Sequence, residues 1–148
     1  LPGILGLSGQ ETEVRDDPKG SMFISPVDAS HFFRQNEKEG QILVITGLAK
    51  NQYKTARGFI RLKGLLHDSQ GEILKEQTVY CGNILTEDEL MTLSMEEMTK
   101  RFNKRGGEKG VNIKAPPGGS VKFMIVFNRI PADLAEYTVE VFSSESAE

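Results

Sequence analysis

Few side chains in this sequence have the types and spacing that covalent or metal chemistry needs. The chain has one cysteine, Cys81, and two histidines, His31 and His67. Neither histidine stands at a spacing typical of a base that activates a thiol, and a cysteine at a strand end is more often a small buried apolar residue. One cysteine and two distant histidines cannot supply a structural zinc site. We therefore expect no catalytic residue, metal ligand or cofactor, which leaves an intermolecular disulfide as the remaining chemical role of Cys81.

Three further segments could bind ions, and each has a simpler structural explanation. A group of acids suggests a calcium site, but all of them stand at predicted helix starts, where acids are favoured. These acids are Glu87, Asp88, Glu89, Glu96 and Glu97. The segment GGEKG (106–110) lacks the Gly-Lys-Ser/Thr end of a phosphate loop. Four basic residues could contact an anionic lipid or phosphate, although they also compensate the dipole at a helix end. These bases are Lys100, Arg101, Lys104 and Arg105.

The composition limits the class of protein. A chain of 148 residues is about one domain and can bury a core without disulfides. The fraction of hydrophobic residues is 38%, and 15 glycines without any tryptophan favour a turn-rich β fold. A net charge of −3 argues against a dedicated nucleic-acid-binding protein, because phosphate contacts need a basic excess.

Residues 1–22 are polar and interrupted by glycine and proline, which predicts a flexible linker or juxtamembrane stalk before one domain over 23–148. No apolar run approaches the roughly 20 residues that span a bilayer. The chain begins with Leu1, and its first ten residues lack the features of a signal peptide. We therefore expect a fragment of a longer protein, with any membrane anchor upstream of it.

Alternating apolar and polar residues predict six or seven short strands. Two hairpins are expected, each with a turn rich in Gly, Asp or Asn, followed by two strands after a Pro-Gly turn. The run 42–45 is apolar on both faces, which indicates a strand that is covered on both sides. The expected strands cover 30–36, 41–51, 57–66, 73–80, 111–114, 120–128 and 136–142. This pattern predicts a mainly β protein, an antiparallel immunoglobulin-like β-sandwich.

A helical insertion interrupts the strands over 82–110. Two capping boxes, one at Thr86 and one at Ser94, predict helices over about 87–93 and 95–104, so the insertion holds one or two helices at about 86–105. The second helix has an apolar stripe made of Met95, Met98 and Phe102. This stripe either packs on the sheet or forms a surface for a partner, since methionine tolerates varied contacts.

Four segments together resemble an uncharacterised bacterial family of extracytoplasmic β-sandwich domains. They are ITGLAKN (45–51), LLHDSQGEIL (65–74), PPGGSVKFMIVF (116–127) and YTVEVF (137–142), and the resemblance extends over 31–143. Members of that family follow a cytoplasmic zinc ribbon and one transmembrane helix, and the domain has no known activity. The resemblance implies structural roles only: Gly47 and Asn51 at a strand end, Asp68 and Gly71 in a hairpin turn, and Pro117 with Gly118 before a strand. The insertion at 82–110 departs from the shortest version of the family pattern, in which the strands follow one another more directly.

These observations leave several hypotheses about function. The first is a non-catalytic interaction or scaffold domain of a membrane-anchored envelope protein, in the periplasm, that binds another envelope protein as a monomer or weak dimer. The second is a cytoplasmic enzymatic or ligand-binding domain with a pocket between insertion and sheet, formed by Cys81, Asn83 and His67. The third is a surface for anionic lipid at the four basic residues of the insertion.

Overall fold

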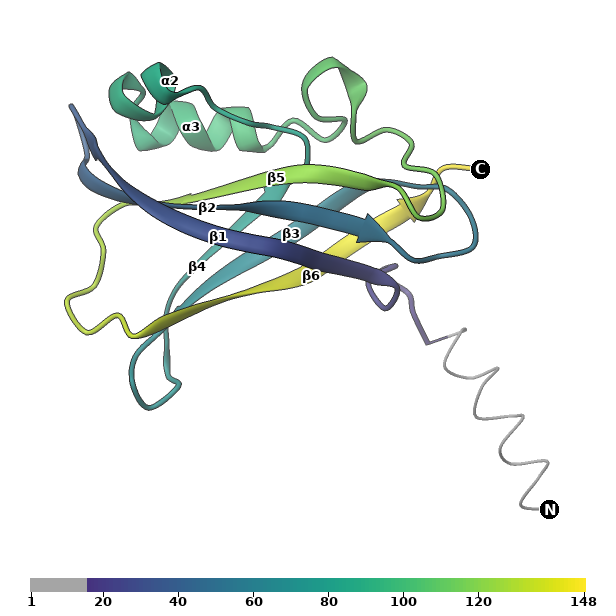
Figure 1. The fold of residues 1–148 in the computed structure, drawn as a ribbon, viewed down its shortest axis with the longest axis horizontal. Helices are drawn as coiled ribbons and strands as arrows, with labels where there is room; N and C mark the ends of the chain where they lie inside the picture. Colours follow the sequence, from purple (N-terminus) through teal and green to yellow (C-terminus); the bar gives the residue numbers. More distant parts are fainter. Residues whose placement is uncertain (1–15) are drawn as a thin grey trace.

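Six β-strands form two antiparallel sheets in the computed structural model, which describes residues 16–148 (Figure 1). The first sheet has the order β1-β2-β5, and the second has the order β4-β3-β6. The strands are β1 (Ile24–Asn36), β2 (Gly40–Asn51), β3 (Arg57–His67), β4 (Ile73–Tyr80), β5 (Ser120–Phe127) and β6 (Glu136–Ser146). The predicted mainly β, antiparallel sandwich is therefore confirmed.

Both predicted hairpins form, and their register follows the alternation of the sequence. In the first hairpin Phe33 lies opposite Leu43, and in the second Leu62 lies opposite Val79. The expected strand over 111–114 is wrong: residues 111–113 form turns, and only Ala115 makes an isolated bridge, to Arg57.

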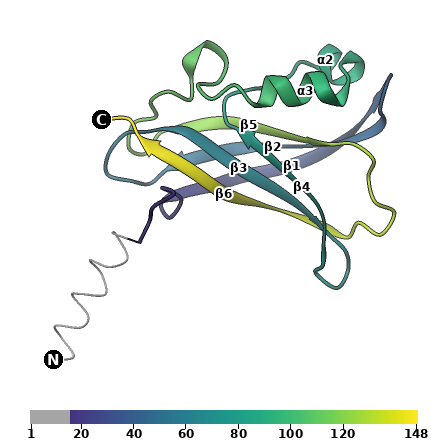
Figure 2. The ribbon, with the colours of Figure 1, turned by 180° about the vertical axis from the view of Figure 1, so that it is seen from behind.

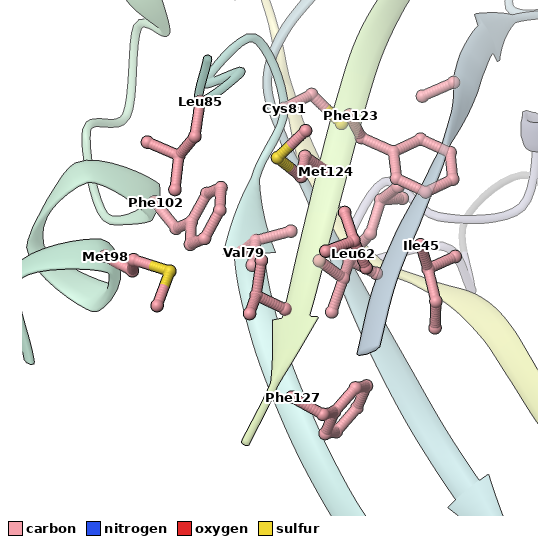
Figure 3. Packing of buried hydrophobic residues seen from close by; sticks show 14 of the residues in the cluster. Ile45, Leu62, Val79, Cys81, Leu85, Met98, Phe102, Phe123, Met124 and Phe127 are labelled. Atoms are coloured by element: carbon pink, nitrogen blue, oxygen red, sulfur yellow. The ribbon is translucent and has the colours of Figure 1, made fainter. Parts of the chain in front are cut away.

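The core fills the space between the two sheets. Leu43 and Ile45 of β2 pair with Phe127 and Ile125 of β5, and all four side chains are at most 1% exposed. The sheets approach closely at Gly64 of β3, because a Cβ atom at that position would lie 3.1 Å from a methyl carbon of Ile125. Figure 3 shows the side chains of this layer from close by.

The helical insertion covers the other face of the first sheet (Figures 1 and 2). Helix α2 (Glu87–Thr92) contacts β1, and helix α3 (Met95–Phe102) contacts β4 and β5. Both begin with the predicted capping boxes, and a short 3-10 helix, η1 (Glu108–Gly110), follows. The apolar run Ile42–Ile45 is buried on both faces as predicted, because it lies between the helices and the second sheet.

The described part of the predicted linker is attached to the sandwich. The backbone N–H of Ser144 in β6 donates to the carbonyl of Lys19 at 2.8 Å, and the hydroxyl of Tyr53 donates to the carboxylate of Asp17. Gly20 is buried against Ser144. Residues 17–20 of the predicted linker therefore contact the sandwich, while residues 1–15 lie outside the described part of the chain. No helix within 16–148 is long and apolar enough to cross a membrane.

Candidate interaction surface

The apolar stripe of helix α3 faces the interior. Met98 and Phe102 are 0% and 2% exposed, and they pack in the same cluster as Val79 of β4 and Met124 of β5 (Figure 3). Met95 is half-buried beside this cluster. The hypothesis that Met95, Met98 and Phe102 form a partner surface is therefore wrong for Met98 and Phe102, because buried side chains cannot be contact residues. The alternative, that the stripe covers the sheet, describes what these two residues do.

The basic residues of the insertion are largely matched by acids. Arg101 pairs with Glu89 of helix α2 and with Glu108, and the Glu89 contact raises the pKa of the guanidinium. Arg105 lies 2.9 Å from a carboxylate oxygen of Glu145. Lys100 lies 3.9 Å from Glu96 of the same helix, and Lys104 is exposed. These pairs weaken the positive field at the helix end. The anionic-lipid surface remains a prediction.

The predicted pocket of Cys81, Asn83 and His67 does not form. Cys81 is 0% exposed, and burial raises the pKa of its thiol. The register of β3 and β4 places Tyr80, next to Cys81, opposite Arg61. His67 lies six residues further along β3, or about 20 Å away, where its Nε2 atom is 2.9 Å from the hydroxyl of Thr138. The hypothesis that these three side chains converge is therefore wrong.

A different surface emerges where β1 and β6, the outer strands of the two sheets, lie next to each other (Figure 1). His31 and Phe33 of β1 share the inward face of Leu43 and Ile45, their partners on β2. His31 is nevertheless exposed, and Phe33 is 42% exposed. Because the second sheet ends at β6, it does not extend over these two side chains.

A pocket of about 430 Å³ occupies this position, and we call it the β1–β6 pocket. It is lined by His31, Phe33 and Leu43 from the first sheet and by residues 134–137 at the start of β6. The ring of His31 stands edge-on to Tyr137, with 5.2 Å between the ring centroids, and edge-on to Phe33, at 6.2 Å. Aromatic rings in this arrangement form an apolar wall. Such a pocket can accept an apolar or aromatic side chain.

The backbone of β1 is available beside this pocket. A β-bulge between Val27 and Ser30 interrupts the pairing with β2, and Asp28 in it has a φ of 55°. After the bulge, residues 30–36 pair with β2 without interruption. An outer strand directs alternate N–H and C=O groups away from its sheet. One of these groups has a side-chain partner within the described residues, since Arg34 Nη1 donates to the carbonyl of Phe33 at 2.9 Å.

Acidic side chains surround this edge. Asp28 and Glu37, at the two ends of the stretch 30–36, are exposed, as is Glu136 beside the pocket. None of the three forms an ion pair with another described residue, although Asp28 lines a separate pocket together with Lys122. The one Lys or Arg residue on this stretch, Arg34, is matched by Glu87 at 2.8 Å. The surface is therefore apolar at its centre and negatively charged at its rim.

Sequence reasoning missed this surface. The alternation in SHFFRQN (30–36) predicts a strand, but it does not reveal whether the opposite sheet extends over the apolar face of that strand. The two neighbouring aromatic residues, Phe32 and Phe33, were the available signal, because they place an apolar ring on both faces of one strand.

Comparison with known proteins places the chain in a family. Residues 27–141, from the bulge of β1 to the middle of β6, match the family described as "Protein of unknown function (DUF3426)". Neither the curated proteins nor the solved structures contain a match. The resemblance to an uncharacterised family is thereby confirmed, whereas the zinc ribbon, the transmembrane helix and the location outside the cytoplasm stay predictions. Since the match extends over more than three quarters of its length, the chain belongs to the DUF3426 family of proteins of unknown function.

Proposed function

We propose that this domain is a non-catalytic interaction module of a membrane-anchored envelope protein, and that its contact surface is the β1–β6 pocket with the adjacent edge of β1. The observation that carries the proposal is the exposure of His31 and Phe33 on a face that the rest of the sandwich buries. Exposed aromatic residues around a pocket are typical of surfaces that bind protein partners. The proposed partner is another envelope protein.

The position of residues 17–20 supports this arrangement. They attach to β6 at Ser144, whereas the pocket is lined by Glu136 and Tyr137 at the start of the same strand. Eight residues of strand, or about 25 Å, separate these two ends, and Figure 1 places them at opposite ends of the sandwich. A domain held from the side of residues 17–20 would direct the pocket away from its anchor.

The environment of Cys81 supports a role without covalent catalysis. Its thiol is buried in the core cluster, and burial raises its pKa, so that the thiol stays protonated at neutral pH. A protonated, inaccessible thiol is a poor nucleophile. The residue contributes packing at the end of β4.

Site-specific photo-crosslinking in cells tests the contact surface. A benzophenone amino acid is placed at Phe33 in the full-length protein and, as a matched control, at Ile73, an exposed apolar residue on β4. We expect a discrete adduct with another protein from position 33, and its loss when Leu134→Lys places a charge in the pocket. No adduct from position 33, or the same adduct from both positions, would refute the assignment.

Fusion of reporter enzymes to the C-terminus of the full-length protein tests the location. Alkaline phosphatase, which folds to its active form only outside the cytoplasm, should be active as a fusion, and a cytoplasm-dependent fluorescent reporter should be dark. The reverse result would contradict the envelope assignment while leaving the contact surface open to the crosslinking experiment.

A further inference from the structure

We infer, on the basis of the proposed function, that the occupant of this surface is an extended basic segment of the partner protein, which pairs with β1 over residues 30–36 as a fourth strand of the first sheet. An apolar side chain of the segment fills the β1–β6 pocket, and Lys or Arg residues on either side of it face the acidic rim. The recognition mode is strand addition, in which backbone hydrogen bonds supply affinity and a side-chain pocket supplies specificity.

The two sides of the sandwich differ in how their outer strands are covered. On the β4–β5 side, three carbonyl groups at or beyond the edge of β5 accept hydrogen bonds. Lys75 Nζ donates to Asn128 at 2.5 Å, Gln77 Nε2 donates to Val126 at 3.3 Å, and the N–H of Gly82 donates to Lys122 at 2.7 Å. On the other side, residue 19 covers β6 at Ser144.

The stretch 30–36 of β1 has no comparable cover within the described chain. Arg34 donates to one carbonyl on this stretch, that of its neighbour Phe33, and the same guanidinium is held by Glu87. A long outer strand with open backbone groups is a template for pairing with another chain. Seven residues match the length of an ordinary strand. The fold therefore closes the edge of β5 and leaves this part of β1 available for an added strand.

The position of the pocket fits the alternation of an added strand. Successive side chains of a strand point to opposite faces of the sheet, so every second residue of the segment would lie on the inward face, beside His31 and Phe33. The β1–β6 pocket opens on that face, between these residues and Tyr137. A strand bound to β1 would place one side chain into the pocket and cover the apolar surface that the second sheet leaves exposed.

The charges select the sequence of the segment. Glu37 stands at one end of the stretch, and Glu136 is the one carboxylate that lines the pocket. Asp28 stands at the other end, although it lines a separate pocket together with Lys122. The positive charge of Arg34 is already offset by Glu87. A segment with basic residues on both sides of an apolar anchor gains favourable interactions at each end, and an acidic segment meets like charges.

A synthetic peptide tests this inference on the full 148-residue chain. The probe has ten residues, alternating Val and Thr, with a central Phe and one Lys near each end. The comparison peptides carry Glu in place of Lys, or N-methyl groups on alternate backbone nitrogens. Fluorescence anisotropy measures affinity, and amide hydrogen exchange followed by NMR locates the bound strand.

We expect the Lys peptide to bind about tenfold more tightly than the Glu peptide and to slow the exchange of amides within 30–36. N-methylation should abolish both effects. The variant Glu136→Lys should reduce the preference for the Lys peptide, whereas Glu72→Lys, at an exposed position in the β3–β4 turn, should not. Absence of saturable binding, equal affinity for the two charged peptides, or binding without protection of 30–36 would overturn the inference.

Two further outcomes would assign a different occupant and also overturn it. Protection of 30–36 that appears with rising protein concentration, without peptide, would mean that a second copy pairs with β1. Protection that disappears when residues 1–15 are removed would mean that this chain supplies the strand. If the crosslink from position 33 persists in cells while the peptide fails, the interaction surface stands and only the strand-addition mode is refuted.

Discussion

The side chain of Asn112 pairs with both backbone groups of Ile60. Its Nδ2 atom donates to the Ile60 carbonyl at 3.0 Å, and its Oδ1 atom accepts from the Ile60 N–H at 3.0 Å. The same amide donates to the carbonyl of Arg105 at 3.0 Å. Asn112 is 0% exposed. The Ile60 carbonyl also accepts from the N–H of Cys81 at 2.9 Å, whereas Asn112 supplies the acceptor for the Ile60 N–H. The buried amide thus fixes the segment after helix α3 to the second sheet.

Replacing this amide should be costly. Asn112→Ala leaves the N–H of Ile60 buried without a partner, while the Ile60 carbonyl keeps the N–H of Cys81 at 2.9 Å. We therefore expect a loss of about 1–3 kcal/mol in the free energy of unfolding. Denaturant titration measures the change. Asn103→Ala is the matched control, because Asn103 is exposed, and it should stay within about 0.5 kcal/mol of the parent. Equal midpoints for the two variants would show that the Asn112 pairing does not support the fold.

Gly20 should not tolerate a side chain. Its φ is 67°, and a Cβ atom there would overlap Nη2 of Arg57 and the carbonyl oxygen of Ser144. Gly71 also has a positive φ but has nothing within 4 Å of a Cβ atom. Gly71→Ala should therefore lower the free energy of unfolding by about 1 kcal/mol, because alanine is strained at a positive φ. Gly20→Ala should either cost about 1–3 kcal/mol more or detach the segment.

The amide of Ser144 distinguishes these two results for Gly20→Ala. It donates to the carbonyl of Lys19, so detachment of residues 17–20 should accelerate its hydrogen exchange while the midpoint of unfolding changes little. Equal effects of the Gly20 and Gly71 substitutions on both readouts would contradict the close contacts at Gly20.

The thiol of Cys81 should react only when the protein opens. It is 0% exposed, and burial raises its pKa, so both access and thiolate formation are suppressed. An aromatic disulfide reagent should therefore modify native protein slowly and denatured protein at once. In a Ser146→Cys variant, the exposed new thiol should react promptly under native conditions. Rapid modification of Cys81 in the native parent protein would refute the burial on which the non-catalytic proposal relies.

Glu89 links the two helices and should make stability depend on pH. The hydrogen bond from Arg101, followed by that from the Thr86 backbone, lowers the pKa of its carboxyl. A carboxyl whose pKa is lower in the folded state stabilises the protein at a pH above its pKa in the unfolded state, about 4.3. This stabilisation is lost as the pH falls through the pKa of the folded state. Glu89→Gln should therefore destabilise the protein by about 0.5–1 kcal/mol at pH 7.

The difference in stability between Glu89→Gln and the parent should shrink as the pH falls below about 4, because the parent carboxyl is then protonated and uncharged, like the amide of Gln. Thermal unfolding at a series of pH values measures it. Glu72→Gln, which removes an exposed carboxylate without an ion pair in the described chain, should leave stability nearly unchanged at each pH. A difference for Glu89→Gln that does not vary with pH would contradict the role of the ionised carboxylate.

Local patterns predicted the strands because alternation records burial on one face. The same argument failed for VNIK (111–114), where Val111 and Ile113 are 51% and 53% exposed and Asn112 is buried. A strand there would have buried the two apolar residues. The segment instead turns Asn112 inward, where its side chain accepts from the buried N–H of Ile60 and donates to the Ile60 carbonyl. A contact between residues so distant in sequence leaves no trace in local periodicity.

The candidate site was hidden for a related reason. The sequence predicts an apolar face for β1, but whether Phe33 is covered depends on where the second sheet ends. The apolar stripe of helix α3, in contrast, is covered by the sheets at Met98 and Phe102. Its spacing predicts one apolar face without stating whether a sheet or a partner covers it. Both questions concern the arrangement of layers, which a single sequence does not specify.

Met98 and Met95 together test which way helix α3 faces. Met98 is 0% exposed in the core cluster, whereas Met95 is half-buried at its margin. Met98→Ala should therefore cost about 2–4 kcal/mol in the free energy of unfolding, through lost burial and the cavity that remains. Met95→Ala should cost less than about 1 kcal/mol. Both variants keep the helix propensity high, so denaturant titration compares packing alone. If Met98→Ala were as mild as Met95→Ala, helix α3 would not pack as described, and its stripe would again be a candidate contact surface.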